Sequence, residues 1–300
     1  MKGFKICEEG SSIEKVCQKS GTLSLVAKGG SIEVLVQELR AGTRFFVQPG
    51  DSDDLMEFFR VIKGCLEVSD GKGTLIKPGD SFYAYRLEES VSLLTLEDTE
   101  LLYVCSQPVF QYISRQIKEL KELLEKVEAK DVYTHSHGKR VRDLAFAVGE
   151  KLGLSGNRLE NLAFAGFFHD IGKAGVPESI LKKPGALTTE EFRIIMTHAQ
   201  KGAEMVEGTL LEGTARIIEQ HHERSDGSGY PKGLKEDETT LEARILAVVD
   251  SYDAMTSDRP YRSAMSPRQA IDELVSLAGV KYNAQVVEAL KQSLIEIGEL

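Results

Sequence analysis

Four of the six histidines of this 300-residue chain lie in one run, residues 162 to 262, together with acidic residues and apolar stretches. His169 and Asp170 follow an apolar stretch in LAFAGFFHDIGK, and His198, His221 and His222 follow shorter ones. A single histidine is most often an ordinary core or surface residue. Taken together, the set predicts a metal centre at the edge of a hydrophobic core, because imidazole and carboxylate groups bind transition metals well and a metal offsets the desolvation of polar groups.

The motifs HDIGK, HHE, DGSGYP and AVVDSYDAMTSDRPYR occur in this order. They resemble those of the HD-GYP subgroup of HD-domain phosphohydrolases, and the resemblance extends over residues 131 to 290. It implies an enzyme of bacterial second-messenger signalling that hydrolyses cyclic di-GMP to pGpG, with further cleavage to GMP left open. Two alternatives stay open: hydrolysis of another cyclic dinucleotide or phosphoester, and a catalytically weak receptor for the dinucleotide or for a signalling protein. Seven intact ligands favour the enzyme.

The resemblance assigns these seven residues to two divalent metal ions. The first ion has His137, His169 and Asp250, the second has His198, His221 and His222, and Asp170 bridges both. His137 is preferred to His135 because Arg140 follows it at the family's spacing. Tyr133 replaces a glutamate that binds a third metal in some members, so two metals are predicted. The chemistry favours the same set, because two ions about 3.5–4 Å apart can activate a water and clamp a phosphodiester. Mixed histidine and carboxylate ligation suits iron or manganese, with zinc as an alternative.

The resemblance also assigns catalytic and substrate-binding residues. Lys173 is expected near the scissile phosphate, where an ammonium stabilises negative charge. Gly229 and Tyr230 belong to a substrate loop, whose tyrosine can stack on or hydrogen-bond a guanine. Arg259 and Arg262 are expected to contact phosphates and guanines, because guanidinium binds both in a bidentate manner. The ordinary interpretation of these residues, as a turn and as surface cations, stays open.

Residues 1 to 106 are predicted to form β structure. Short β-branched and aromatic runs alternate there with glycine, proline and aspartate, a pattern typical of a sandwich or small barrel. EFFRVIKGCLEV followed by LIKPGDSF resembles the two motifs of cupin barrels. Active cupins have histidines where this chain has Asp51 and Asp53 and near Tyr83, and Glu57 alone retains a ligand type. We therefore expect a sensor or an oligomerisation module in this region.

The fold class that follows is multidomain α and β: a cupin-like all-β barrel over 1–106, a connecting helix over 107–130 and an all-α HD-GYP domain over 131–300. Apolar residues of the connecting helix recur three and four positions apart, as in a coiled-coil seam. They are Phe110, Ile113, Ile117, Leu120, Leu124 and Val127. A homodimer through the 109–127 helix and a single amphipathic helix packed on its own domain both satisfy this pattern.

Composition limits the partners. The net charge of −10 disfavours DNA and anionic membrane surfaces, so an anionic substrate needs local cations or metals. The four cysteines, Cys7, Cys17, Cys65 and Cys105, match no metal or redox spacing. No apolar run is long enough to span a membrane, and the start of the chain does not resemble a signal peptide. A cytoplasmic protein is expected, with a signalling-protein partner at the GYP loop as a further expectation.

Overall fold

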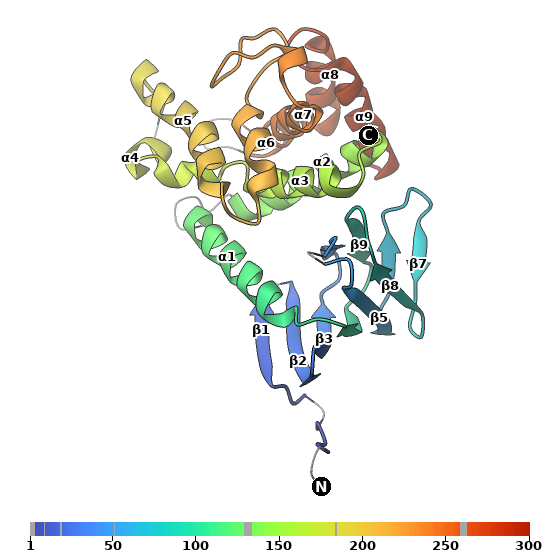
Figure 1. Ribbon diagram of the computed structural model, residues 1–300. Helices are drawn as coiled ribbons and strands as arrows, with labels where there is room; N and C mark the ends of the chain where they lie inside the picture. Colours follow the sequence, from blue (N-terminus) through green and yellow to red (C-terminus); the bar gives the residue numbers. More distant parts are fainter. Residues whose placement is uncertain are drawn as a thin grey trace. The chain divides into compact units, whose positions relative to one another are not determined.

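The computed structural model describes residues 4–8, 10–18, 20–50, 52–128, 134–183, 185–258 and 263–300. The chain divides into two compact units, Met1–Leu120 and Lys121–Leu300, and helix α1 (Phe110–Glu128) contains the boundary (Figure 1). The division predicted at residues 106 and 130 stays a prediction. Among the described residues, no helix is both long and apolar enough to cross a bilayer.

The first unit is an all-β domain followed by the start of α1. Its strands are β1 (Glu14–Gln18), β2 (Gly21–Gly29), β3 (Ile32–Leu39), β4 (Arg44–Val47), β5 (Met56–Lys63), β6 (Leu66–Val68), β7 (Thr74–Ile76), β8 (Ser81–Tyr85), β9 (Val91–Thr95) and β10 (Thr99–Cys105). They form two antiparallel sheets, in the orders β1-β2-β3-β10-β5-β8 and β4-β9-β6-β7.

One hydrophobic core lies between these sheets. Strand β10 shows why: its alternate residues Leu101, Tyr103 and Cys105 are buried, as expected for a strand with one face toward a core. Leu66 and Leu93 of the smaller sheet belong to the same buried cluster. The all-β prediction is thus confirmed in the form of a two-sheet sandwich, the arrangement of cupin-type jelly rolls. No pairing between described strands closes a barrel.

The second unit is helical, as predicted. Its elements are α2 (Thr134–Lys151), α3 (Gly156–Phe168), the 3-10 helix η1 (Ile171–Gly175), α4 (Glu178–Leu181), α5 (Thr189–Val206), the 3-10 helix η2 (Glu212–Thr214), α6 (Ala215–Gln220), the 3-10 helix η3 (Glu236–Glu238), α7 (Leu241–Thr256), α8 (Pro267–Ser276) and α9 (Ala284–Glu296). Helix α2 packs against α3, α7 and α9, and α7 also contacts α6 and α8. Helix α7 is buried along most of its length, so this apolar helix forms the centre of the unit.

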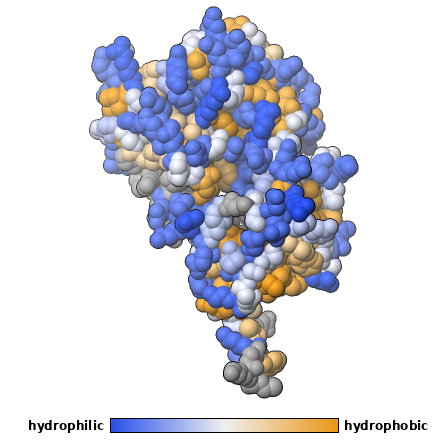
Figure 2. All heavy atoms as spheres, viewed as in Figure 1, coloured by the Kyte–Doolittle hydropathy of each residue, from blue (hydrophilic) through white to orange (hydrophobic). Residues whose placement is uncertain are grey.

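Side-chain caps fix where several helices begin. Thr188 and Glu191 form a capping box at the start of α5, which satisfies amide groups that the helix itself leaves without partners. Asn283 accepts a hydrogen bond from the Val286 amide at the start of α9. Figure 2 shows hydrophilic and hydrophobic residues interspersed on the visible surface of both units, as is ordinary for globular proteins.

Candidate metal centre

All seven predicted metal ligands lie in the second unit, on or next to helix ends and the central helix. His137 is on α2, His169 and Asp170 join α3 to η1, His198 is on α5, His221 and His222 directly follow α6, and Asp250 is on α7. The chain order of these elements separates the residues by up to 113 positions, and the packing of the helices brings them together.

One group consists of His137, His169, Asp170 and Asp250. The Nε2 atoms of His137 and His169 are 3.1 Å apart. Asp250 Oδ1 lies 3.5 Å from His137 Nε2 and 3.7 Å from His169 Nε2. Asp170 Oδ2 lies 3.5 Å from His169 Nε2. Donor atoms of His137, His169 and Asp170 lie close enough together for one metal ion, and Asp250 lies next to both of these histidines.

The second group consists of His198, His221 and His222. The Nε2 atoms of His198 and His221 are 3.4 Å apart. The His222 ring lies 5.0 Å from the ring of His198 and 3.9 Å from the ring of His221. Donor atoms of all three rings lie close enough together for one metal ion.

Asp170 connects the two groups. Its Oδ2 is beside His169, and its Oδ1 lies 3.4 Å from His198 Nε2. Lys173 donates a hydrogen bond of 2.6 Å to Oδ2. A carboxylate with one oxygen toward each histidine group is suited to bridge two ions. The ammonium of Lys173 lies next to this carboxylate.

Hydrogen bonds orient the rings so that Nε2 points inward. His169, His198 and His221 each place Nδ1 within 2.6–3.0 Å of the carbonyl oxygen three residues earlier in the chain. If Nδ1 carries the proton, it donates there and Nε2 keeps a free electron pair. This partner on the far nitrogen is the arrangement that orients metal-binding histidines.

His137 has a carboxylate partner instead. Its Nδ1 lies 2.7 Å from Asp253 Oδ2. Arg140 donates to both oxygens of Asp253, at 2.5 and 2.8 Å, and to Ser257 Oγ at 3.0 Å. Asp253 therefore connects the arginine predicted from the motif to the ring of His137, and it orients that ring.

Several pKa shifts favour the forms that bind metals, and that of His137 is the exception: burial lowers its pKa, but the carboxylates of Asp253, Asp250 and Asp170 outweigh this and raise it. Burial lowers the pKa of His198, lowers that of His222 to about 3 and lowers that of His221 well below its usual range. Burial raises the pKa of Asp170, but the charges of Lys173 and the histidines outweigh it and hold this pKa well below its usual range. Neutral imidazole and ionised carboxylate are the forms that bind metals.

Gly172 of HDIGK explains how η1 reaches α5. A Cβ atom at this position would lie 1.9 Å from the carbonyl oxygen of His198 and 2.5 Å from the amide nitrogen of Gly202. Only a glycine permits this approach of the two backbones. The close contact keeps Asp170, two residues earlier, beside His198.

The DGSGYP loop lies against the second histidine group. The Tyr230 ring is 4.6 Å from the His222 ring. Glu223, the acid of HHE, is buried, and its carboxylate accepts hydrogen bonds from the amides of Lys232 and Leu234 at 2.7 and 2.9 Å. A Cβ atom on Gly229 would lie 2.4 Å from the His222 carbonyl oxygen, so a larger residue there would push the loop away.

Several residues predicted from the sequence lie outside the described part of the chain. Arg259, Arg262 and Tyr133 are not among the described residues, and neither is the side chain of His135. The sequence interpretation also missed the roles of Asp253 and Glu223. The signals were present: an acid within the apolar α7 needs a buried partner, and Glu223 directly follows two predicted ligands.

The donor set fits two divalent transition metals. Imidazole nitrogens and carboxylate oxygens are suitable ligands for iron, manganese or zinc, and no cysteine occurs after Cys105. Together these side chains could hold two ions side by side with Asp170 between them.

Known proteins share this region. The family model described as HD domain matches residues 111–286. The chain is 42% identical over 186 residues to a cyclic di-GMP phosphodiesterase of Thermotoga maritima, covering 61% of this chain and 50% of that protein. It is 35% identical over 189 residues to the cyclic di-GMP phosphodiesterase response regulator RpfG of Xanthomonas campestris, covering 62% and 50%. The chain thus spans about half the length of these curated relatives.

The chain is also similar to a relative named for another cyclic dinucleotide and to a solved structure. A 3′3′-cGAMP-specific phosphodiesterase of Vibrio cholerae is 35% identical over 169 residues, covering 56% of this chain and 37% of that protein. The solved structure of Bd1817, described as an HDG"Y"P protein from Bdellovibrio bacteriovorus, is 17% identical with a TM-score of 0.47, covering 84% of this chain and all of that one.

Proposed function

Because the chain belongs to the HD domain family, we propose that it is a metal-dependent phosphodiesterase that hydrolyses cyclic di-GMP to pGpG. The observation that carries the proposal is the position of Asp170, with one oxygen beside each histidine group. The relatives named cyclic di-GMP phosphodiesterases support the choice of substrate. Whether pGpG is cleaved further to GMP is decided by the products of the assay below.

Two divalent ions, iron or manganese, complete the proposed site. The first would be held by His137, His169 and Asp250, the second by His198, His221 and His222, and both by Asp170. When bound, such ions supply Lewis acidity toward phosphoryl oxygens and lower the pKa of a water. The inward Nε2 atoms and the hydrogen-bonded Nδ1 atoms are what this chain contributes to holding them.

Lys173 is the proposed catalytic cation. Its Nζ lies 2.6 Å from Asp170 Oδ2, so it is next to any phosphate bound between the histidine groups. A fixed ammonium stabilises the negative charge that develops on the phosphate during hydrolysis. Lys173→Met should therefore lower turnover and leave the metal content of the purified protein unchanged.

The DGSGYP loop and the two arginines are proposed to bind the dinucleotide. Tyr230 lies next to His222, which puts an aromatic ring within reach of a base when the phosphate is at the metals. Arg259 and Arg262 are assigned from the sequence motif, as cations for phosphates and guanines. Gly229 permits the loop to approach the histidines.

A cyclic dinucleotide with one adenine is the second candidate substrate, because one relative is named for 3′3′-cGAMP. The deciding experiment uses the full chain purified without oxygen and compares the turnover of cyclic di-GMP, 3′3′-cGAMP and bis-(p-nitrophenyl) phosphate. We expect cyclic di-GMP to be hydrolysed fastest and Asp170→Asn to be inactive on all three. Binding of cyclic di-GMP without hydrolysis would favour the receptor, and faster cleavage of 3′3′-cGAMP would change the substrate.

The arginines give a separate test of substrate recognition. Arg259→Ala and Arg262→Ala should each weaken turnover of cyclic di-GMP about ten- to a hundredfold, the effect of losing a hydrogen bond to a charged group. Bis-(p-nitrophenyl) phosphate has no guanine, so its turnover should change far less. Equal losses on both substrates would mean that these arginines do not contact the bases.

The assembly of the chain is a further part of the proposal. We propose a cytoplasmic homodimer through the 109–127 helix, with a signalling-protein partner at the GYP loop. Helix α1 (Phe110–Glu128) spans nearly all of this segment, while the seam side chains of Leu120 and Leu124 lie outside the described ones. Leu120→Glu combined with Leu124→Glu should dissociate the dimer in sedimentation. A wild-type chain that is monomeric at micromolar concentration would contradict the dimer.

A further inference from the structure

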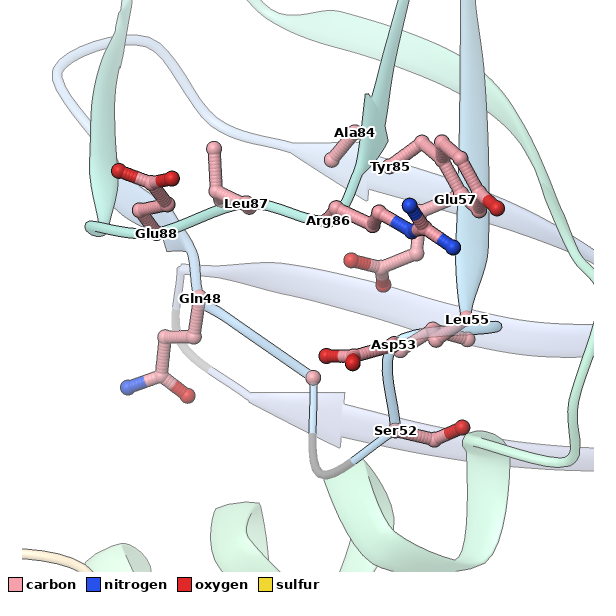
Figure 3. A pocket seen from close by; sticks show the side chains of 11 residues that line it. Gln48, Ser52, Asp53, Leu55, Glu57, Ala84, Tyr85, Arg86, Leu87 and Glu88 are labelled. Atoms are coloured by element: carbon pink, nitrogen blue, oxygen red, sulfur yellow. The ribbon is translucent and has the colours of Figure 1, made fainter.

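The β domain contains two adjoining hollows, and Glu57 lines both of them. Their volumes are about 350 and about 460 Å³, within the range of sites for small molecules. Gln48, Ser52, Leu55 and Glu57 line both hollows. Figure 3 shows the smaller one, where the side chains of Glu57, Asp53 and Arg86 surround the opening.

The larger hollow has aromatic walls and little charge. Phe45, Phe59, Tyr103 and Tyr112 line it, and the other polar side chains there are glutamines and a serine. Among the described residues that line this hollow, Glu57 carries the only charge. A hollow lined by aromatic rings, amide side chains and a single carboxylate favours a ligand with a cationic group over a ligand with an anionic group.

Burial destabilises the charged form of Glu57. Its carboxylate accepts a hydrogen bond from the hydroxyl of buried Tyr103, a neutral partner that does not offset the charge. Burial raises the pKa of Glu57, although the hydrogen bond from Tyr103 lowers it. A cation next to Glu57 would offset this effect of burial, because opposite charges attract more strongly in such a half-buried place than in bulk water.

We propose that these hollows bind a small organic cation, with its ammonium group beside Glu57 and its body against the aromatic walls. Aromatic faces attract ammonium groups directly, most strongly when water is excluded. An anionic ligand would meet the carboxylates of Asp53, Glu57 and Glu88 in the smaller hollow, against the single guanidinium of Arg86. The site is independent of the metal centre and of the reaction proposed there.

The larger hollow also includes part of α1. Tyr112 and Gln116, both on this helix, line it. The helix begins firmly attached to β3, because the Glu33 carboxylate accepts hydrogen bonds of 2.9 Å from the amides of Val109 and Phe110. A ligand in the hollow would therefore touch the helix that continues into the second unit, and it would restrain the first turns of that helix.

The ligand class is tested by calorimetry on the full chain with matched probes. Phenethylamine and benzyltrimethylammonium are the cations, while 3-phenylpropionate and 2-phenylethanol carry the same ring without positive charge. We expect at least one cation to bind with a Kd of about 1 mM or less, and the anion and the alcohol to bind at least tenfold more weakly. Equal or tighter binding of 3-phenylpropionate, or no binding of either cation at about 10 mM, would overturn the proposal.

Two variants place the cation within the hollow. Glu57→Gln should weaken cation binding about ten- to a hundredfold, as expected for the loss of a charged hydrogen-bond partner. Glu100→Gln, on β10 but lining neither hollow, is the matched control and should bind normally. Tyr112→Ala should also weaken binding. Tyr112 is exposed on α1, so this variant should fold normally and misfolding would not explain a loss of binding. Unchanged binding by both Glu57→Gln and Tyr112→Ala would place the cation elsewhere.

Hydrogen–deuterium exchange then tests the contact with α1. The cation that binds best should slow exchange of amides in the first turns of α1 in the wild-type chain, and it should do so less in Glu57→Gln at the same concentration. Unaltered exchange in α1 at saturating cation would reject the contact with the helix.

Discussion

Each unit of the chain holds a carboxylate that is largely removed from bulk water, buried for Asp170 and half-buried for Glu57, and the groups around the two carboxylates differ. Asp170 of the helical unit lies between two histidine groups and accepts a hydrogen bond from Lys173. Glu57 of the β unit lies among aromatic rings with a neutral hydroxyl partner. The pKa of Asp170 is held well below its usual range despite burial, whereas burial raises that of Glu57.

The difference indicates which kind of ligand each of the two carboxylates suits. Lys173 and the histidines of both groups lie next to Asp170. They stabilise its charge before any metal binds, so the site is preorganised. The hydrogen-bond partner of Glu57 is a neutral hydroxyl, so burial of its charged form destabilises the folded domain, and a bound cation would reduce this destabilisation. The first arrangement suits a permanent cofactor, and the second suits a ligand that comes and goes.

The largest effect is expected from disturbing the backbone contact that holds Asp170 in place. In Gly172→Ala, the added Cβ would lie 1.9 Å from the His198 carbonyl oxygen, so η1 must move away from α5. A displacement of this kind can lower turnover about a hundredfold. Turnover of bis-(p-nitrophenyl) phosphate is the measurement.

Gly175→Ala is the matched control on the same 3-10 helix. Its Cβ would meet the flexible Lys201 side chain at 3.0 Å, which can move aside. If both variants lost activity equally, the close approach of η1 to α5 would not be what positions Asp170.

The next effect concerns the ring of His137. Asp253→Asn should weaken metal binding about ten- to a hundredfold, the usual consequence of removing a partner that orients a ligand. The amide cannot accept from His137 and Arg140 as the carboxylate does. Competition with a metal chelator measures the affinity. Ser257→Ala removes a hydroxyl that accepts from Arg140 and donates a 3.3 Å hydrogen bond to Asp253 Oδ2, but it keeps the carboxylate next to His137, so it should change the affinity far less. An Asp253→Asn protein with wild-type affinity would show that the ring needs no such partner.

The smallest expected effects test the electrostatic difference between Asp170 and Glu57. In the metal-free chain, Asp170→Asn should lower the free energy of unfolding of the helical unit by about 1–3 kcal/mol, because Lys173 loses a buried charged partner. Glu57→Gln should raise that of the β unit by about 1 kcal/mol or less. Amide exchange in each unit under metal-free conditions gives both values, and changes of the same sign would break the comparison.

The pH dependence has opposite signs for the same reason. Between its ordinary value near 4.5 and its raised folded pKa, Glu57 keeps a proton in the folded state that the unfolded state has lost. Its contribution to stability is therefore largest at low pH and falls as the pH rises through that window. The folded pKa of Asp170 is lowered, so its contribution is present above the unfolded pKa and is lost as the pH falls. Glu57→Gln should remove the first trend and leave the second.

Much of the helical unit could be predicted from the sequence, because its ligands stand in short motifs at fixed places. His169 and Asp170, for example, are adjacent in the chain and end an apolar helix. Asp253 was missed because its role depends on the packing of α7 against α2, which brings it to His137 and Arg140. The acid within an apolar helix signals that a buried partner exists, but no local pattern identifies His137 and Arg140 as that partner.

The β unit was less predictable. Alternating apolar residues gave its strands, since that pattern follows from one buried sheet face. The hollows did not follow, because they depend on which residues of separate strands and of α1 meet. Glu57 drew attention only as the remaining ligand type of a cupin motif, and its partner Tyr103 is 46 positions away.

The central claim is that Asp170 holds two metal ions in one site. Its most direct test is the metal content of the full chain purified without oxygen, for the wild type, Asp170→Asn and Asp170→Ala. We expect two transition metal ions per wild-type chain, and clearly fewer in Asp170→Ala together with the loss of cyclic di-GMP hydrolysis. An Asp170→Ala protein that keeps two ions and near-normal turnover would contradict the claim.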